Sequence, residues 1–300
     1  MRNNLKTHLK RSWSERFFDY GNLLFMIVLI IITFYPMLYI LFASLSDPTL
    51  LAQHRGLLTT PMGFSVDAYI RVFENSNILT GYRNTIIYVV GGTTIDVVLT
   101  TLGAFVLSRR NVLWQEPILF LIIFTMFFSG GLIPTYLLVS RSLGWVNSPL
   151  ALIVPGAIQT FNLIIMRTAF IEVPYELEEA AKIDGANDFQ VLVQVYLPLI
   201  KPVLAVMILF YAVGHWNSFF PALIYLRDRN LYPLQLILRE ILIQNSTDSM
   251  TITSATGNVE MVAETVKYAT IVVVTLPILL IYPFLQRYFV KGVLIGGIKG

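Results

Sequence analysis

Six stretches of about 20 predominantly apolar residues constrain the fold of this chain more than any other feature. A helix needs about 20 such residues to cross a hydrocarbon core of about 30 Å. Of the 300 residues, 56% are hydrophobic and 13% are charged, whereas soluble domains carry roughly 25% charged residues. The sequence therefore predicts an all-α integral membrane protein, with spans near residues 22–44, 84–107, 117–139, 149–170, 203–226 and 266–285.

The lysine and arginine residues predict how these spans are oriented. If both chain ends are cytoplasmic, 13 of the 21 Lys and Arg residues lie on the cytoplasmic side, and the bias is strongest before the first span. Such an excess is typical of cytoplasmic segments. We therefore expect a cytoplasmic amino-terminal segment, 1–21, and a cytoplasmic carboxy-terminal tail, 286–300. The net charge of +3 does not indicate a nucleic acid partner. The apolar composition implies that membrane lipid surrounds the chain.

Two long segments then lie on the outer side, 45–83 and 227–267. Turn-forming residues in the first predict a short surface helix over 66–73, and an apolar stretch in the second predicts an interfacial helix over 234–243. Neither segment is large enough to bury a core of its own. We therefore expect a single domain over residues 1–300.

Proline and glycine interrupt several of the predicted spans. Proline removes a helical hydrogen bond, and paired glycines weaken a helix while they let neighbours approach closely. Broken helices are tolerated in membranes where protein or a water-filled cavity satisfies the freed backbone groups. The set favours a transport path, with ordinary kinks in a packed bundle as the alternative. The interruptions are Pro36, Pro134, Pro155, Pro221, Pro277, Gly91-Gly92 and Gly130-Gly131.

Few polar residues lie at membrane depth. Asp96 is in the middle of a span, where a charge costs at least about 2.5 kcal/mol, so we expect it to face a partner, a cavity or an interface. Functional and structural roles for Asp96 are both open. His215 has no second histidine nearby, so we expect a hydrogen-bonded bundle residue and no metal site. The polar residues at this depth are Asp96, Gln159, Asn162, His215, Trp216 and Asn217.

No catalytic arrangement is present in the sequence. It contains no GxxxxGK[ST] phosphate loop, no GxSxG nucleophile elbow and no HExxH zinc motif. It also has no cysteine, which excludes disulfides, thiolate metal sites and cysteine nucleophiles. We therefore expect no catalytic residue, cofactor or metal in this chain, and no enzymatic activity of its own.

A charged segment separates the fourth and fifth spans. Residues 172–200 hold six of the 18 acidic residues. Pro174 suits the first turn of a helix, the acids that follow complement the positive helix end, and Gly185 stops the helix. Asn187 then caps a second helix, which ends at Pro198. A hairpin that lies on lipid would be basic, so this acidic hairpin is predicted to dock a soluble cytoplasmic partner.

The spacing within this hairpin resembles the EAA motif of ABC importer permeases. The matching residues are Glu179-Ala180-Ala181, then Gly185 after three residues, then Val195-Tyr196-Leu197-Pro198 after nine, with Val195 in place of the usual isoleucine. Nearly the whole chain resembles the maltose-type carbohydrate uptake permeases, most closely their smaller, MalG-like subunit and the LplC/YtcP-like subgroup. The supporting stretches are PMGFSVDAYIRVF, YRNTIIYVVGGT, GHWNSFFPALIYL and QRYFVKGVLIGGIKG.

This resemblance implies a six-helix type I ABC importer transmembrane domain in a bacterial cytoplasmic membrane. Its partners would be a larger, MalF-like permease, two ATPase subunits that bind ATP and Mg, and an extracytoplasmic solute-binding protein. The hairpin would be the coupling helix, and Glu178 and Lys182 are expected to pair within it. The residues that would contact the ATPases are Glu178, Glu179, Ala180, Ala181, Asp184, Gly185, Leu197 and Pro198 in the hairpin, and Lys291, Gly292, Gly296 and Gly297 in the tail.

The function that the resemblance implies is carbohydrate import by alternating access, with an oligosaccharide as the solute. Trp216 and Phe219 would stack on sugar faces, and Asn217 would bond to hydroxyls. The subgroup is associated with acidic oligosaccharides such as those of pectin or alginate, yet no basic residue is expected at membrane depth to pair with a uronate. Two alternatives remain, an ion-coupled secondary transporter that uses Asp96 and an ABC permease for a non-sugar solute.

Overall fold

The computed structural model describes residues 13–251 and 257–296, and the side chains of 13–243, 262–281 and 283. Within these ranges the regular elements are helices, and an isolated bridge joins Ser46 to Phe64. The chain divides into two units, which are described separately. Unit 1 comprises Met1–Arg71 and Thr251–Val272, and unit 2 comprises Val72–Met250 and Val273–Gly300.

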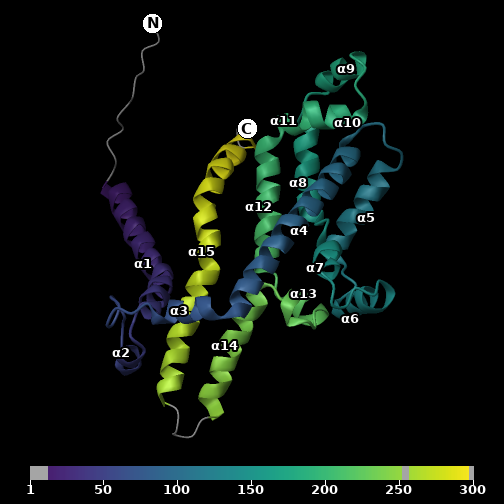
Figure 1. Ribbon diagram of the computed structural model, residues 1–300. Coiled ribbons are helices and arrows are strands. Elements are labelled where there is room, and N and C mark those ends of the chain that lie inside the picture. Colours follow the sequence, from purple (N-terminus) through teal and green to yellow (C-terminus); the bar gives the residue numbers. More distant parts are fainter. Residues whose placement is uncertain (1–12, 252–256, 297–300) are drawn as a thin grey trace. The chain divides into compact units, whose positions relative to one another are not determined.

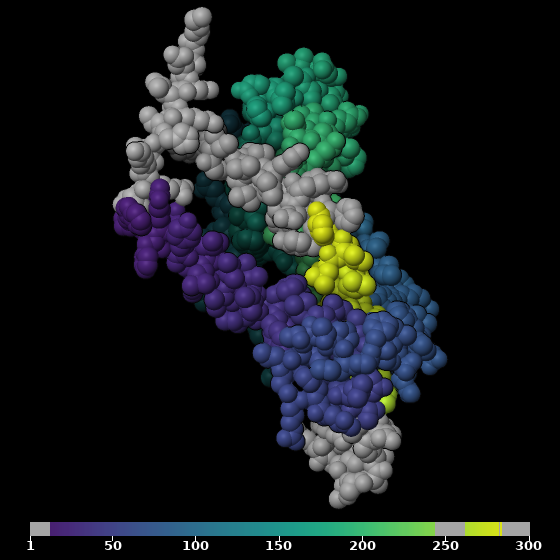
Figure 2. All heavy atoms as spheres, turned by 90° about the vertical axis from the view of Figure 1, so that its left-hand side faces the viewer, coloured from purple at the N-terminus to yellow at the C-terminus, as the bar shows by residue number. Residues whose placement is uncertain are grey.

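Unit 1 is built on the long helix α1 (Trp13–Ser44), followed by α2 (Pro48–Gln53) and by α3 (Asp67–Glu74) as far as Arg71. Most large apolar side chains of α1 are exposed, as its projecting side chains in Figure 2 illustrate. The small core of this unit contains Ala43, Leu51 and Leu58. An exposed apolar helix of this length is what a membrane span requires, because lipid covers its side chains.

Unit 2 is organised around α4 (Ser76–Ser108), which packs against α8 (Thr160–Ile171) and α12 (Lys201–Asn217) (Figure 1). Small residues on α4 permit this close approach. A Cβ atom added to Gly92 would lie 2.5 Å from Nε2 of His215 on α12. The main core of the unit joins these three helices through residues such as Phe105, Met166 and Met207.

The other described elements complete the helical architecture (Figure 1). They are α5 (Gln115–Phe127), α6 (Leu132–Leu137), η1 (Leu138–Ser142), α7 (Leu150–Ile153), η2 (Val154–Gly156), α9 (Tyr175–Ile183), α10 (Asp188–Gln190), η3 (Val191–Tyr196), α11 (Leu197–Leu199), α13 (Phe220–Tyr225), η4 (Arg229–Leu231), α14 (Leu234–Thr251) and α15 (Gly257–Gly296).

Among residues 13–251 and 257–296, three helices are long and apolar enough to cross a membrane, and up to six spans result if each of three bent helix pairs counts as one. The expected span 117–139 is not one helix: α5 ends at Phe127, and the chain resumes at Leu132 after a bend of 111°. Gly131, at φ 84°, makes this turn possible because glycine has no Cβ penalty there. The expected span 149–170 bends by 50° after Val154–Gly156.

Two other expected boundaries also differ from the structure. The helix expected over 203–226 ends at Asn217, and α13 resumes at Phe220 with Pro221 in its first turn. The last helix, α15, continues to Gly296, so residues 286–296 belong to it and do not form a separate tail. The expected surface helix 66–73 corresponds to α3, and the expected helix 234–243 is the first part of the longer α14.

Candidate functional site

The hairpin at residues 172–200 folds as its local sequence predicts, and it lies at one end of unit 2 (Figure 1). Pro174 precedes the first residue of α9 with an extended backbone, and Gly185 follows its end at φ 86°. Asn187 caps α10 through a reciprocal pair of 2.9 Å hydrogen bonds with Gln190. The turns of the hairpin are therefore determined by residues close together in sequence.

The second half of the hairpin is anchored in the main core of unit 2. Val191, Leu192 and Tyr196 are buried there. The ring of Tyr196 meets the ring of Phe105 on α4 edge to face, with centroids 5.5 Å apart, and meets Phe170 on α8 at 5.8 Å. Burial of three large side chains contributes several kcal/mol, so the hairpin should move together with the ends of α4 and α8.

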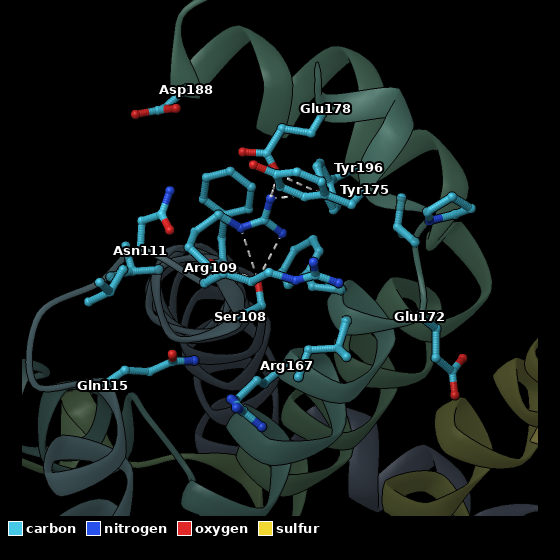
Figure 3. Close-up of a pocket in the computed structure, with 18 of the residues that line it drawn as sticks. Ser108, Arg109, Asn111, Gln115, Arg167, Glu172, Tyr175, Glu178, Asp188 and Tyr196 are labelled. Carbon is cyan, nitrogen blue, oxygen red and sulfur yellow. Dashed lines mark hydrogen bonds and ion pairs between the residues drawn. The ribbon is translucent and has the colours of Figure 1, made fainter. Parts of the chain in front are cut away.

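A polar cluster fastens the first half of the hairpin to α4 (Figure 3). The guanidinium of Arg109 lies over two neighbouring rings, 4.5 Å from the centroid of Phe105 and 4.2 Å from that of Tyr196. Its Nη1 donates to Glu178 Oε2 and to the Tyr196 hydroxyl, the latter at 2.7 Å. The Tyr196 hydroxyl in turn donates to Glu178 Oε2 at 3.0 Å. Together the stacking and the hydrogen bonds hold the arginine in one position.

Glu178 is the acidic centre of this cluster. Its side chain is only 4% exposed, and its Oε1 lies 2.9 Å from Nζ of Lys182, as the spacing of four residues predicts. Burial alone would raise the pKa of Glu178, but hydrogen bonds from Lys182 and Tyr196 and the charge of Arg109 lower the pKa below its ordinary value. The hydrogen bond to Glu178 raises the pKa of Lys182. The cluster therefore carries its charges at neutral pH.

The structure corrects the expectation that Glu178 faces a partner protein. Glu178 points to Arg109 of its own chain, because the arginine at the end of α4 needs a counter-charge where it is half-buried. The exposed residues of the motif are Glu179, Ala180, Asp184, Gly185 and Pro198, whereas Ala181 and Leu197 pack partly against the core.

Two large apolar residues extend the exposed surface of the hairpin. Ile183 is 86% exposed and Phe189 is 67% exposed. Sequence reasoning missed both residues, although large apolar side chains beside an acidic stripe were a usable signal. Exposed hydrophobic side chains of this size, rimmed by charges, mark protein contact sites. The outer face of the hairpin is therefore a candidate docking surface.

A pocket of about 720 Å³ lies at the junction of the hairpin with the ends of α4 and α8 (Figure 3). Arg110 lies 5.0 Å from the ring centroid of Tyr175 on its wall. Nε of Arg167 and the side-chain amide of Gln115 both donate to the Leu107 carbonyl, at 2.8 and 2.5 Å. Both bonds satisfy one carbonyl in the last turn of α4, where the backbone acceptors have no partner within the helix.

The residues expected along a solute path fall into two groups, and the first is buried. Asp96 is 1% exposed, and its Oδ2 lies 2.7 Å from Nε2 of His215. His215 therefore has a hydrogen-bond partner within the bundle, and both a functional and a structural role of Asp96 stay open. Asn162 is also buried and donates to the exposed Gln159 at 3.4 Å. Within the described part of the chain, no group of three metal-ligating side chains comes together.

The aromatic residues of this set differ from one another in exposure. Trp216 is buried with its ring edge to face with Tyr82, at a centroid distance of 6.3 Å, so it offers no face to a solute in this conformation. The expectation that Trp216 stacks on sugars does not hold here. Asn217 is exposed and donates to the Val213 carbonyl at 3.0 Å. Phe219 is half-exposed, and Arg239 lies 5.8 Å from its centroid.

A family model for the inner membrane component of binding-protein-dependent transport systems matches residues 100–295. The chain belongs to this family. It is similar to the protein LplC of Bacillus subtilis, with 44% identity over 95% of this chain and 96% of LplC. It is also similar to the polygalacturonan/rhamnogalacturonan transport system permease protein YtcP of the same organism, with 40% identity over 95% of this chain and 99% of YtcP.

A solved structure supports the same assignment of this permease chain. A chain of a bacterial ABC transporter involved in the import of the acidic polysaccharide alginate is 33% identical, with a TM-score of 0.84, and the match covers 93% of this chain and 99% of that one. The predicted resemblance to ABC importer permeases and the predicted all-helical transmembrane domain are thereby confirmed. As a permease subunit the chain is not itself the catalyst, and the ATPase partners bind ATP.

The family also places the protein in the inner membrane as a multi-pass component of a transporter that depends on a binding protein. The orientation of its ends remains a prediction. The tail residues expected to contact the ATPases, Lys291, Gly292, Gly296 and Gly297, lie outside the described side chains, and Gly297 lies outside the described residues altogether.

Proposed function

We propose that this chain is the permease subunit through which an ATP-driven importer moves an oligosaccharide into the cell by alternating access. The observation that carries the proposal is the construction of the hairpin. Its inner side is fastened to α4 by Arg109, Glu178 and Tyr196, whereas its outer side presents Ile183 and Phe189. A hairpin that transmits motion from ATPase subunits to the membrane spans must be attached to the spans on one side and be free to bind the ATPases on the other.

The hairpin lies on the cytoplasmic side in this proposal, as the distribution of Lys and Arg predicts. Its exposed face, with Glu179, Ala180, Asp184, Ile183 and Phe189, docks on one of two ATPase subunits. A second, larger permease and an extracytoplasmic solute-binding protein complete the assembly. The ATP and Mg are bound by the ATPase subunits, and this chain supplies only the hairpin and half of the path.

The mechanism follows from how the hairpin is attached. Closure of the ATPase subunits on ATP displaces the hairpin, and the buried Tyr196 and the Arg109–Glu178 pair carry that displacement into α4 and α8. The ATPases can drive the change only if they bind the hairpin better in one arrangement of the spans than in the other. When the hairpin is firmly attached, it changes position together with the spans. The ATPases can therefore bind the hairpin with different affinities in the two arrangements of the spans.

The class of solute is proposed from the similar proteins. YtcP is described as a polygalacturonan/rhamnogalacturonan permease, and the similar solved structure comes from an importer of the acidic polysaccharide alginate. Both solutes are polymers that contain acidic sugars. We therefore assign an acidic oligosaccharide to this permease, and an ABC permease for a non-sugar solute is the weaker alternative.

The proposal is tested first by isolating the complex. The chain is tagged, extracted gently from its native membrane, and the co-purifying proteins are identified by mass spectrometry. We expect an ATPase and a second permease, and Phe189→Asp should reduce recovery of the ATPase. Leu143→Asp, at an exposed apolar residue outside the hairpin, is the matched control. Recovery of this chain alone, under conditions that keep other transporters intact, would refute the assembly.

The energy source separates the importer from an ion-coupled carrier. Uptake should be abolished by orthovanadate, which inhibits ABC ATPases, and should survive dissipation of ion gradients by ionophores. The reverse pattern would point to a carrier that uses Asp96 as its coupling carboxylate. Asp96→Asn, in the same vesicles, should then abolish the ionophore sensitivity.

A further inference from the structure

A second concave site lies in unit 2, at the connection between α13 and α14. A pocket of about 430 Å³ is lined by Arg227, Arg229, Tyr232, Arg239, Glu240 and Ile243. Under the proposed orientation this pocket faces the outer side of the membrane, where solute arrives. Nothing in the hairpin mechanism uses these residues.

The pocket carries an excess of positive charge. Arg229 pairs with Glu240, with Nη2 and Oε2 2.8 Å apart. Among the described residues, the guanidinium groups of Arg227 and Arg239 have no carboxylate partner. Arg239 also lies 5.8 Å from the ring centroid of Phe219. Two arginines without counter-ions, in a pocket that Tyr232 also lines, form a site that favours an anion with an apolar face.

Buried polar side chains of α4 hold the loop that carries this site. The side-chain amide of Asn84 donates to the carbonyls of Asn230 and Tyr232, at 2.6 and 3.0 Å. The hydroxyl of Tyr88 donates to the Leu231 carbonyl at 2.7 Å. Asn84 and Tyr88 are both buried, so these bonds form in surroundings with little competing water. The loop is therefore held in one shape before any ligand arrives.

The two ends of the loop are held in the same way. At the start, Oδ1 of Asn147 accepts hydrogen bonds from the backbone N–H groups of Arg227 and Asp228, at 3.0 and 2.8 Å. At the end, the backbone N–H of Leu234 donates to the hydroxyl of Thr85 at 2.8 Å. A loop fixed at both ends and in the middle loses little further entropy on binding, which favours affinity.

We propose that Arg227 and Arg239 form a subsite for the carboxylate groups of an acidic oligosaccharide as it enters the permease from the binding protein. This inference rests on the proposed function and adds to it a recognition element within this chain. The planar guanidinium bonds a carboxylate through two parallel N–H groups. The ring of Tyr232, on the pocket wall, offers a face for the apolar side of a sugar ring. A neutral sugar has no group that these arginines require.

The test uses the whole transporter in nanodiscs and proteoliposomes, with its ATPases, second permease and binding protein. The probe is radiolabelled trigalacturonate, and maltotriose is the neutral comparison. The variants are Arg227→Gln and Arg239→Gln, and Arg141→Gln, at an exposed arginine outside the pocket, is the control. Loss of one charge-assisted contact should lower trigalacturonate uptake at sub-saturating concentration about tenfold. The affinity of the binding protein for the complex should not change.

Three outcomes would overturn this inference. Uptake by both pocket variants equal to that of Arg141→Gln would show that the pocket does not contact the solute. A loss of affinity for the binding protein itself would make the arginines a docking surface for protein. Wild-type uptake of maltotriose without trigalacturonate would remove the subsite and the acidic class of solute, and would leave the proposed oligosaccharide importer standing. Failure to move either sugar would instead contradict the proposed function.

Discussion

Replacing Glu178 by glutamine tests whether the attachment of the hairpin to α4 is needed for coupling. The substitution keeps the size of the side chain and removes its charge. The carboxylate of Glu178 accepts bonds from Arg109, from Tyr196 at 3.0 Å and from Lys182 at 2.9 Å. After the change, the guanidinium of Arg109 stays beside the rings of Phe105 and Tyr196 without a counter-charge.

The magnitude follows from the burial of the partners. Removing one partner of a fully buried ion pair costs about 3–5 kcal/mol. Arg109 is 16% exposed and keeps its bonds to Ser108 and Tyr196, so we place the cost below this range or at its lower limit, about 2–3 kcal/mol. The contribution of Lys182 is smaller, about 0–1 kcal/mol, because that side chain is half-exposed. The population with a detached hairpin should therefore rise roughly 30- to 150-fold.

Two measurements report this change. The ratio of solute moved to ATP hydrolysed in proteoliposomes should fall, because displacement of a loose hairpin no longer moves the spans. The chain has no cysteine, so spin labels can be placed at Ile183→Cys and Asn111→Cys, and their distance distribution should broaden. Glu176→Gln, at an exposed acid of the same helix, is the matched control.

The double variant Arg109→Gln with Glu178→Gln supplies a further check. Removing both charges leaves no unpaired ion, so coupling should partly recover relative to Glu178→Gln alone. The reasoning is refuted if Glu178→Gln behaves like Glu176→Gln in both the transport ratio and the label distances. It is also refuted if the double variant is as severely impaired as the sum of the two single variants.

Three further predictions follow from individual residues. Gly185→Val places a β-branched residue at φ 86°, which costs about 1–2 kcal/mol. Transport per ATP should therefore fall while the amount of protein in the membrane is unchanged. Full transport would exclude a role for this turn. Gly92→Ala puts a methyl group 2.5 Å from Nε2 of His215 and should lower the melting temperature in detergent, whereas Gly91→Ala, with no atom within 4 Å, should not. The pKa of Glu178 is lowered below 4.5. Its contribution to the attachment of the hairpin should therefore be complete above pH 4.5 and be lost as the pH falls through the lowered pKa. The distances between the hairpin spin labels should broaden on such acidification.

The structural features that depend only on residues close together in the chain could be predicted from the amino-acid sequence. The apolar stretches of about 20 residues identified a helical membrane protein, because the thickness of the bilayer sets the length of a span. The turns of the hairpin followed from Pro174, Gly185 and Asn187, since caps and stops act within one helical turn. The pair of Glu178 and Lys182 followed from their spacing of four residues.

Tertiary structure alone decided which distant residues meet. Glu178 was assigned to an external partner until the fold brought Arg109, 69 residues away, against it. Asp96 and His215 form a pair across 119 residues, and neither spacing is a period of a helix. Arg239 likewise reaches the ring of Phe219 only after the chain has turned between α13 and α14. Buried charges find partners wherever packing places them, so the pairing depends on how helices are arranged and not on local sequence.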